Sequence, residues 1–181
     1  MILSNVDIKK AIKEKEIIID PLDESSIGSA SLDLSLGGDV LYYPKDGIDI
    51  DITKPETFND LKMISYSKDE IIRVDPGAFI LGVTAETVEL PDTLAARIDG
   101  RSSLGRLGLA IHSTAGHIDP GFKGKIVLEI SNVGNKAINL YPGTKICQLV
   151  FEQLLTPTST PYSKKKDARY KSQNTVEGSK M

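Results

Sequence analysis

The feature that most constrains the fold is a series of short apolar segments separated by turn residues. Residues 30–36 alternate apolar and polar side chains and end at Gly37 and Gly38, which is typical of a half-buried strand followed by a turn. The same pattern predicts strands at residues 40–43, 79–84, 126–130, 137–140 and 146–155, with turns at 73–77, 91–92, 134–135 and 141–143. This spacing predicts an antiparallel β-sandwich or barrel.

The first residues predict a helix instead. Ser4 can cap it, and Val6, Ile8, Ala11 and Ile12 fall near helical spacing. By contrast, residues 46–68 are too polar and irregular to assign, and we interpret them as an insertion between strands.

Composition bounds the class of protein. The 181 residues fit one domain, and 40% apolar residues with a net charge of −3 describe an ordinary globule with no sign of a nucleic-acid partner. Cys147 is the only cysteine, so no intramolecular disulfide can form, and the N-terminus lacks an apolar signal core. No run approaches the roughly 18 apolar residues that span a bilayer. We therefore expect a cytoplasmic protein without a membrane segment.

The last residues differ in charge from the rest. Residues 157–181 hold six Lys or Arg against two Asp or Glu, while apolar periodicity stops. We therefore divide the chain into a β domain, residues 1–156, and a basic tail, residues 157–181. Such a tail is disordered or is ordered by an anionic ligand; a solvated basic terminus is the alternative.

Residues 100–106 read Gly-Arg-Ser-Ser-Leu-Gly-Arg. Two guanidinium groups and two hydroxyls between glycines match the oxygens of a phosphate. A solvated turn with surface arginines is the alternative, because the segment is neither a Walker loop nor a dinucleotide fingerprint.

Two further segments carry carboxylates. Residues 114–124 read as a turn-rich hairpin in which Asp119 suits a sugar hydroxyl, although Asp119-Pro120-Gly121 is equally a plain β-turn. In residues 125–131, Glu129 interrupts an apolar run, where an unpaired carboxylate would be costly. Glu129 therefore either pairs with an arginine such as Arg106 or is tuned for proton transfer.

In this order and spacing, these segments resemble the dCTP deaminase family of the dUTPase-like superfamily. The resemblance also includes residues 31–37, 143–149 and 167–173, and only residues 46–68 lack a match. It implies a mainly β fold, a distorted β-barrel or jelly-roll-like β-clip with an N-terminal helix. It also implies a homotrimer with active sites at the subunit interfaces.

The resemblance implies a role for each motif. Glu129 would be the general base and acid in deamination at cytosine C4, with Ser102 and the Ala115 carbonyl positioning the water and Arg106 orienting Glu129. Asp119 would bind the 3′-hydroxyl, Phe122 would pack on the deoxyribose, and the main chain of Val127 and Leu128 would read the base. The remaining contacts, to the triphosphate, would come from Arg101, Ser102, Ser103, Leu104, Gly105, Arg106, Gln148, Tyr162, Arg169 and Gln173, with the tail acting as a lid.

The resemblance also implies that Mg²⁺ is bound by the phosphates of the nucleotide and that no protein side chain binds a metal. A zinc deaminase site needs a His/Cys/Cys or three-Cys ligand set. One cysteine together with His112 and His117 does not supply it. We expect structural roles for His112 and Cys147.

The family leaves the product open. Some members release dUTP, whereas bifunctional members carry dCTP to dUMP, the precursor for thymidylate synthesis. Gly116 favours the bifunctional pattern, because it leaves room for a second water that Asp119 could activate, although His117 departs from both patterns. The alternatives are a monofunctional deaminase and a catalytically silent regulator on the same scaffold. In each case dUTP or dTTP would bind as a product or inhibitor.

Overall fold

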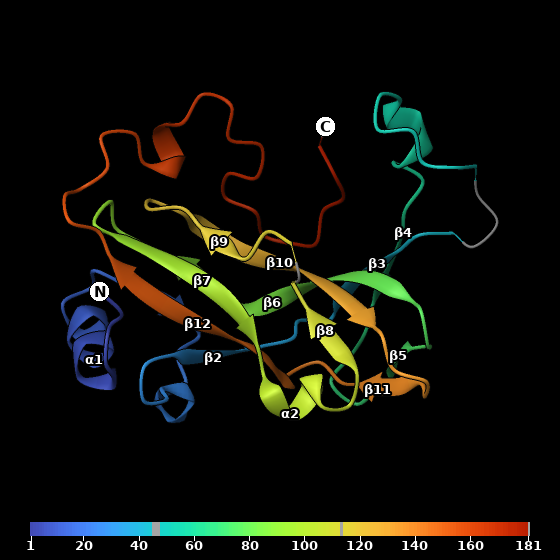
Figure 1. The fold of residues 1–181 in the computed structure, drawn as a ribbon, viewed down its shortest axis with the longest axis horizontal. Coiled ribbons are helices and arrows are strands. Elements are labelled where there is room, and N and C mark those ends of the chain that lie inside the picture. The colour runs from blue at the N-terminus through green and yellow to red at the C-terminus, as the bar shows by residue number, and fades with distance from the viewer. Residues whose placement is uncertain (45–47, 113, 181) are drawn as a thin grey trace.

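The computed structural model describes residues 1–44, 48–112 and 114–180 (Figure 1). Within these residues, two antiparallel sheets and a two-stranded ribbon follow an N-terminal helix. The mainly β prediction with an N-terminal helix is therefore confirmed.

The larger sheet has the strand order β4-β3-β6-β10-β8, and β1 pairs with the end of β6. Its strands are β1 (Ile18–Asp20), β3 (Asp39–Tyr42), β4 (Lys62–Ser65), β6 (Phe79–Glu89), β8 (Leu109–Ile111) and β10 (Lys123–Asn132). The long strands β6 and β10 pair so that Glu129 lies opposite Leu81. A register shift between Lys125 and Val127 marks a β-bulge in β10.

The smaller sheet has the order β2-β12-β7-β9. Its strands are β2 (Leu32–Ser35), β7 (Leu94–Gly100), β9 (His117–Ile118) and β12 (Lys145–Gln153), and the ribbon joins β5 (Ile72–Val74) to β11 (Ile138–Leu140). The short helices are α2 (Ser102–Gly105), η1 (Glu24–Ser26), η2 (Pro55–Thr57) and η3 (Tyr162–Lys164).

The alternation along β10 decides which of its side chains face the core. Ile126, Leu128 and Ile130 are buried, whereas Val127 and Glu129 are only partly buried on the opposite face. Each fully buried side chain of this kind contributes roughly 1.5–3 kcal/mol relative to an exposed one. Glu129 therefore does not interrupt the core, and the expectation of a buried acid is wrong in that respect: its carboxylate is half-exposed.

The N-terminal helix α1 (Asn5–Lys13) begins as the sequence predicted. Ser4 caps it, and a capping box joins Ser4 to Asp7, with each side chain bonded to the other residue's backbone N–H. Ile8 and Ala11 bury one face of the helix against the core.

Several local predictions are wrong. Residues 114–124 do not form a hairpin, because β9 pairs with β7 in one sheet while β10 pairs with β6 and β8 in the other. This segment instead carries the chain between the sheets. The strands β7, β8 and β9 were not predicted, and residues 46–68 contain β4, which extends the larger sheet beyond β3. The prediction for residues 46–68 falls partly on residues 45–47, which lie outside the described residues.

The tail after residue 157 lies against the domain (Figure 1). The backbone of Tyr162 bonds to Pro120, and that of Lys125 bonds to Gln173. Gln173 and Val176 are buried, at 5% and 3% exposure. The tail therefore covers the face of the larger sheet that carries Glu129.

Candidate active site

A pocket of about 450 Å³ opens on the outer face of β6 and β10, beneath the tail. Its lining brings together residues that are far apart in the sequence. From the predicted site it includes Ala115, His117, Asp119, Phe122, Val127, Glu129, Tyr162 and Gln173. The volume falls in the usual range for a small-molecule site.

Glu129 presents its carboxylate to this pocket. Because β8 pairs only with residues 130–132, the described edge of β10 at Glu129 and Val127 is not covered by another strand. The Thr114 hydroxyl donates a hydrogen bond of 2.7 Å to Glu129 Oε2. A half-exposed carboxylate with a hydroxyl donor at its side is suited to moving protons.

His112 connects Glu129 to Ala115. Its backbone N–H donates to the Glu129 carbonyl at 2.7 Å, and its ring Nε2 lies 2.9 Å from the Ala115 carbonyl. Since a carbonyl only accepts, this contact places the ring proton on Nε2. Nδ1 is buried and has no hydrogen-bond partner within residues 1–44, 48–112 and 114–180. His112 has φ = 55°, a left-handed conformation that histidine adopts more often than most residues.

One wall of the pocket is built by aromatic and carboxylate groups. The rings of Phe122 and Tyr162 pack at 5.9 Å between centroids. Asp119 lies 3.5 Å from His117 Nε2. Phe122 is held by backbone bonds to Leu90 and Asp119, so this wall is rigid before any ligand binds.

Sequence reasoning missed several lining residues. Tyr43, Phe79, Leu81, Lys125, Tyr170 and Glu177 also face the pocket, and His112 does so although we expected only a structural role for it. The Gln173 side-chain amide is buried, and its Nε2 has no hydrogen-bond partner among the residues that the structure describes. A buried donor left unpaired is costly, so this amide is available to a polar partner in the pocket.

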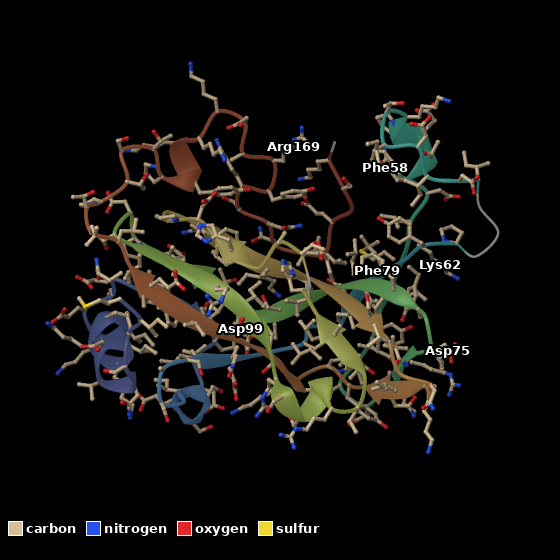
Figure 2. The ribbon with its side chains drawn as sticks, viewed as in Figure 1. Phe58, Lys62, Asp75, Phe79, Asp99 and Arg169 are labelled. Atoms are coloured by element: carbon tan, nitrogen blue, oxygen red, sulfur yellow. The ribbon has the colours of Figure 1, made fainter. Side chains whose placement is uncertain are left out.

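The arginine turn, residues 100–106, lies elsewhere. In Figure 1, α2 is at the opposite end of the molecule from the tail, and Figure 2 shows Arg169 on that tail. Ser102, Ser103, Gly105 and Arg106 are exposed, while Leu104 packs against the core. None of residues 101–106 lines the pocket, and no ion pair joins Arg106 to Glu129 within the described residues.

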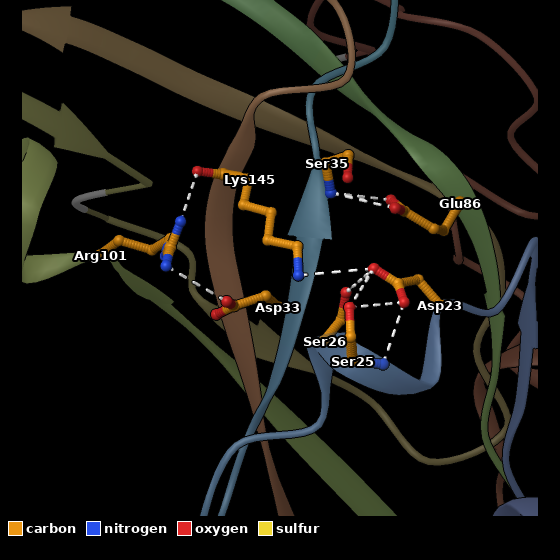
Figure 3. Close-up of polar contacts among 8 residues, drawn as sticks. All are labelled: Asp23, Ser25, Ser26, Asp33, Ser35, Glu86, Arg101 and Lys145. Atoms are coloured by element: carbon orange, nitrogen blue, oxygen red, sulfur yellow. Dashed lines mark hydrogen bonds and ion pairs between the residues drawn. The ribbon is translucent and has the colours of Figure 1, made fainter.

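Arg101 is fixed within this second region (Figure 3). Its guanidinium donates to the Lys145 carbonyl at 3.2 Å and lies 3.4 Å from Asp33. Gln148 is close by, because its backbone pairs with Asp33 on β2 and with Asp99 on β7. One chain therefore holds two separate groups of predicted residues: the pocket, and the arginine turn with Gln148. Arg169 is exposed on the tail and belongs to neither.

Gly116 and Leu128 are constrained by packing. A Cβ on Gly116 would lie 3.0 Å from the Ile98 carbonyl, and the Gly116 carbonyl accepts from the Ile98 N–H at 2.7 Å. Close approach to β7 is thus sufficient reason for glycine there. Leu128 is fully buried, so only its main chain could meet a ligand.

The donor groups do not form a protein-held metal site. Among the residues that the structure describes, no cluster of three or more His, Cys, Asp or Glu side chains occurs. Cys147 is buried in β12, and burial raises the pKa of its thiol far above the usual value, with Glu86 and Asp33 adding to the effect. This thiol packs as an apolar group, as we expected. In the described part of the chain, no helix is long and apolar enough to cross a membrane.

Comparison with known proteins agrees with the fold. The chain is similar to a crystal structure of 2′-deoxycytidine 5′-triphosphate deaminase from Agrobacterium tumefaciens, with a TM-score of 0.66 and 22% identity. The match covers 84% of this chain and 48% of that one, so this chain spans about half its length. The likeness defines the class of fold.

A family model described as dCTP deaminase-like matches residues 2–154. The chain is 45% identical to the dUMP-forming dCTP deaminase of Dictyoglomus turgidum, over 100% of this chain and 95% of that one. It is 44% identical to the protein of that name from Methanosphaera stadtmanae, covering 99% and 93%. The chain belongs to the dCTP deaminase-like family.

Proposed function

We propose that this protein converts dCTP and two water molecules to dUMP, diphosphate and ammonia. The observation that carries the proposal is the Glu129 carboxylate in the pocket, bonded to Thr114 beside the Ala115 carbonyl that His112 holds. The dUMP-forming branch is supported by the identity to relatives that carry this name.

In the deamination step, Glu129 takes a proton from a water as the oxygen bonds to C4 of the cytosine. The carboxyl then returns the proton to N3. It next takes the proton of the new C4 hydroxyl and passes it to the amino group, so that the C4–N bond breaks, ammonia leaves and the C4 carbonyl forms. The Ala115 carbonyl would accept from the attacking water. The uncovered edge of β10 at Val127 would offer main-chain groups to the base.

The other pocket groups would bind the sugar and phosphates. Asp119 would accept from the 3′-hydroxyl, and Phe122 would leave no space for a 2′-hydroxyl. Tyr162 and the unpaired amide of Gln173 would donate toward the phosphates, and Arg169 would reach them as the tail closes.

The second step would break the bond between the α- and β-phosphates by attack of water on the α-phosphorus. Asp119 would take the proton from this water. The triphosphate would carry Mg²⁺, which would shield its charge. The dUMP formed would feed thymidylate synthesis in the cytoplasm.

We also propose a homotrimer in which one subunit supplies the pocket and a neighbour supplies the arginine turn. In one chain, α2 lies on the opposite side of the molecule from the tail that covers the pocket (Figure 1), and neither residues 101–106 nor Gln148 line the pocket; both facts support this arrangement. Ser102 and Arg106 would then reach Glu129 across the interface. Light scattering would test the assembly, and a 19.7 kDa monomer that deaminates dCTP would contradict it.

Resolving the products of dCTP with Mg²⁺ tests the reaction. We expect dUMP, diphosphate and ammonia in equal amounts. Accumulation of dUTP without diphosphate would indicate a monofunctional deaminase. Binding of dCTP without turnover would indicate a catalytically silent regulator. The Glu129→Gln variant serves as the control for contaminating activity.

A further inference from the structure

The end of the tail is tied to the larger sheet by a shared carboxylate. Asp39, the first residue of β3, accepts from the Ser65 hydroxyl on β4 at 2.7 Å through Oδ1. It accepts from the Thr175 hydroxyl at 2.9 Å through Oδ2. The Ser65 and Thr175 hydroxyls and the nearby Lys125 hold the pKa of Asp39 below its usual value. The carboxylate thus joins the tail to two strands.

The next residue adds an apolar anchor. Val176 is 3% exposed and belongs to a small buried cluster with Leu41, Leu81 and Val83, separate from the main core. Leu61 and Val127 pack around this cluster. Because Leu81 and Val127 also line the pocket, the anchor shares its supporting side chains with the site.

Gln173 lies three residues before this anchor. Its carbonyl accepts from the Lys125 N–H at 2.7 Å, and a Cβ on Gly124 would come within 2.8 Å of the same oxygen. The backbone of Gln173 is therefore held tightly against β10. Its side-chain amide faces the pocket with Nε2 unpartnered.

We propose that Asp39, Thr175 and Val176 form a tail latch that positions Gln173 for the nucleotide phosphates. The inference rests on the proposed function and adds positioning residues to it. With the latch, residues 157–173 are a loop fixed at both ends rather than a free terminus. A loop with fixed ends loses less conformational freedom when it orders over a ligand. The latch therefore acts on nucleotide affinity and not on the chemical step.

Thr175→Val tests the latch, because it removes the hydroxyl and keeps the shape. Ser65→Ala is the matched control, since it removes the other hydroxyl from the same carboxylate. We expect Thr175→Val to raise KM for dCTP by roughly three- to tenfold, the value of one hydrogen bond, with kcat unchanged. Ser65→Ala should leave KM within about twofold.

Hydrogen exchange in the free protein provides a reading that does not depend on turnover. Thr175→Val and Val176→Ala should both speed exchange of the Lys125 N–H, which bonds to Gln173, whereas Ser65→Ala should not. The latch would be overturned if Thr175→Val left the exchange of the Lys125 N–H or the KM for dCTP unchanged. It would also be overturned if kcat fell equally in Thr175→Val and Ser65→Ala. If the unsubstituted protein neither binds nor converts dCTP while Lys125 exchange still responds as expected, the proposed function has failed, and the positioning role fails with it.

Discussion

The pocket and the arginine turn are built in different ways. The pocket is held by main-chain bonds and apolar packing, such as His112 N–H to Glu129 and Phe122 against Tyr162. The arginine turn is exposed, and its ordered guanidinium, Arg101, is fixed by Asp33 and by the Lys145 carbonyl (Figure 3). The pocket presents aromatic, apolar and carboxylate groups, whereas the turn presents the guanidinium groups of Arg101 and Arg106.

Under the proposed function, neither the pocket nor the arginine turn is sufficient for catalysis by itself. Proton transfer needs the pocket, and charge neutralisation on a triphosphate needs cations that the described pocket supplies mainly through Lys125. Substitutions in the pocket should therefore affect chemistry, and substitutions in the turn should affect binding of the anion. Five predictions test this division.

The largest expected effect is at Glu129. Glu129→Gln keeps the shape and the hydrogen bond to Thr114 but cannot accept and return a proton. We expect kcat for ammonia release to fall by about 10²- to 10⁴-fold, with dCTP binding retained. Steady-state ammonia assays and calorimetric titration with dCTP measure the two quantities. Turnover that survives the substitution would remove Glu129 from the mechanism.

The next effect is at Arg106. Arg106→Ala should lower kcat/KM by about 10- to 100-fold, because a charge-assisted hydrogen bond to the ligand is lost. Arg73→Ala is a suitable control, since Arg73 is an exposed guanidinium paired with Asp75 on the ribbon. It should leave kcat/KM unchanged.

Co-expression tests whether the two regions belong to different chains. In random trimers of Glu129→Gln and Arg106→Ala subunits, about a quarter of the interface sites would combine an intact pocket with an intact turn. We expect activity near that fraction of the unsubstituted protein. The matched pair is Glu129→Gln with Asp119→Asn, two defects within one pocket, and it should recover nothing. Equal recovery by both pairs would contradict the shared site.

A smaller effect is expected at Thr114, within the pocket. Thr114→Val removes the 2.7 Å hydrogen bond that orients the Glu129 carboxylate. We expect kcat to fall by roughly three- to tenfold with KM for dCTP little changed. The Thr93→Val variant, whose residue lies on the turn before β7, controls for the loss of a hydroxyl. An increase in kcat would mean that the hydrogen bond between Thr114 and Glu129 must break before catalysis.

The sequence predicts the strands that alternate and misses those that do not. β2 and β10 alternate in burial along the strand, and β12 is a longer run of apolar residues interrupted by Gln148. By contrast, β7 contains Ala95 and Ala96, which carry little strand signal, and β9 has only two residues. The path of residues 114–124 between the sheets depends on which strands they meet, and local turn chemistry does not encode this.

The residues of the pocket were likewise predictable only where the local sequence carries a clear pattern. Glu129, Asp119 and Phe122 could be found because each lies within a continuous motif. Tyr43 and Lys125 could not, because they join the pocket only through the pairing of β3, β6 and β10. The partial exposure of Glu129, however, could be predicted. Side chains alternate along a strand, so if Leu128 and Ile130 face the core, Glu129 faces away from it.

The smallest effect concerns the support of the arginine turn at low pH. The Asp23 carboxylate accepts from the Ser25 hydroxyl and N–H and from Ser26, and it lies 3.5 Å from Lys145, the residue whose carbonyl holds Arg101 (Figure 3). These contacts, led by the Ser25 hydroxyl, lower the pKa of Asp23 from 3.8 to about 2. A depressed pKa stabilises the folded state above pH 3.8, and this contribution disappears as the pH falls toward 2.

Asp23→Asn should therefore lower Tm by about 1–3 °C at pH 7 and lose its effect as the pH approaches 2. Thermal unfolding of both proteins at pH 7, 4.5 and 3 measures this. The pocket residues Glu129 and Thr114 do not contact Asp23, so kcat at pH 7 should be unchanged. A difference in Tm that grows below pH 3.8 would have the wrong sign for a carboxylate with a lowered pKa, and would remove Asp23 from the support of the turn.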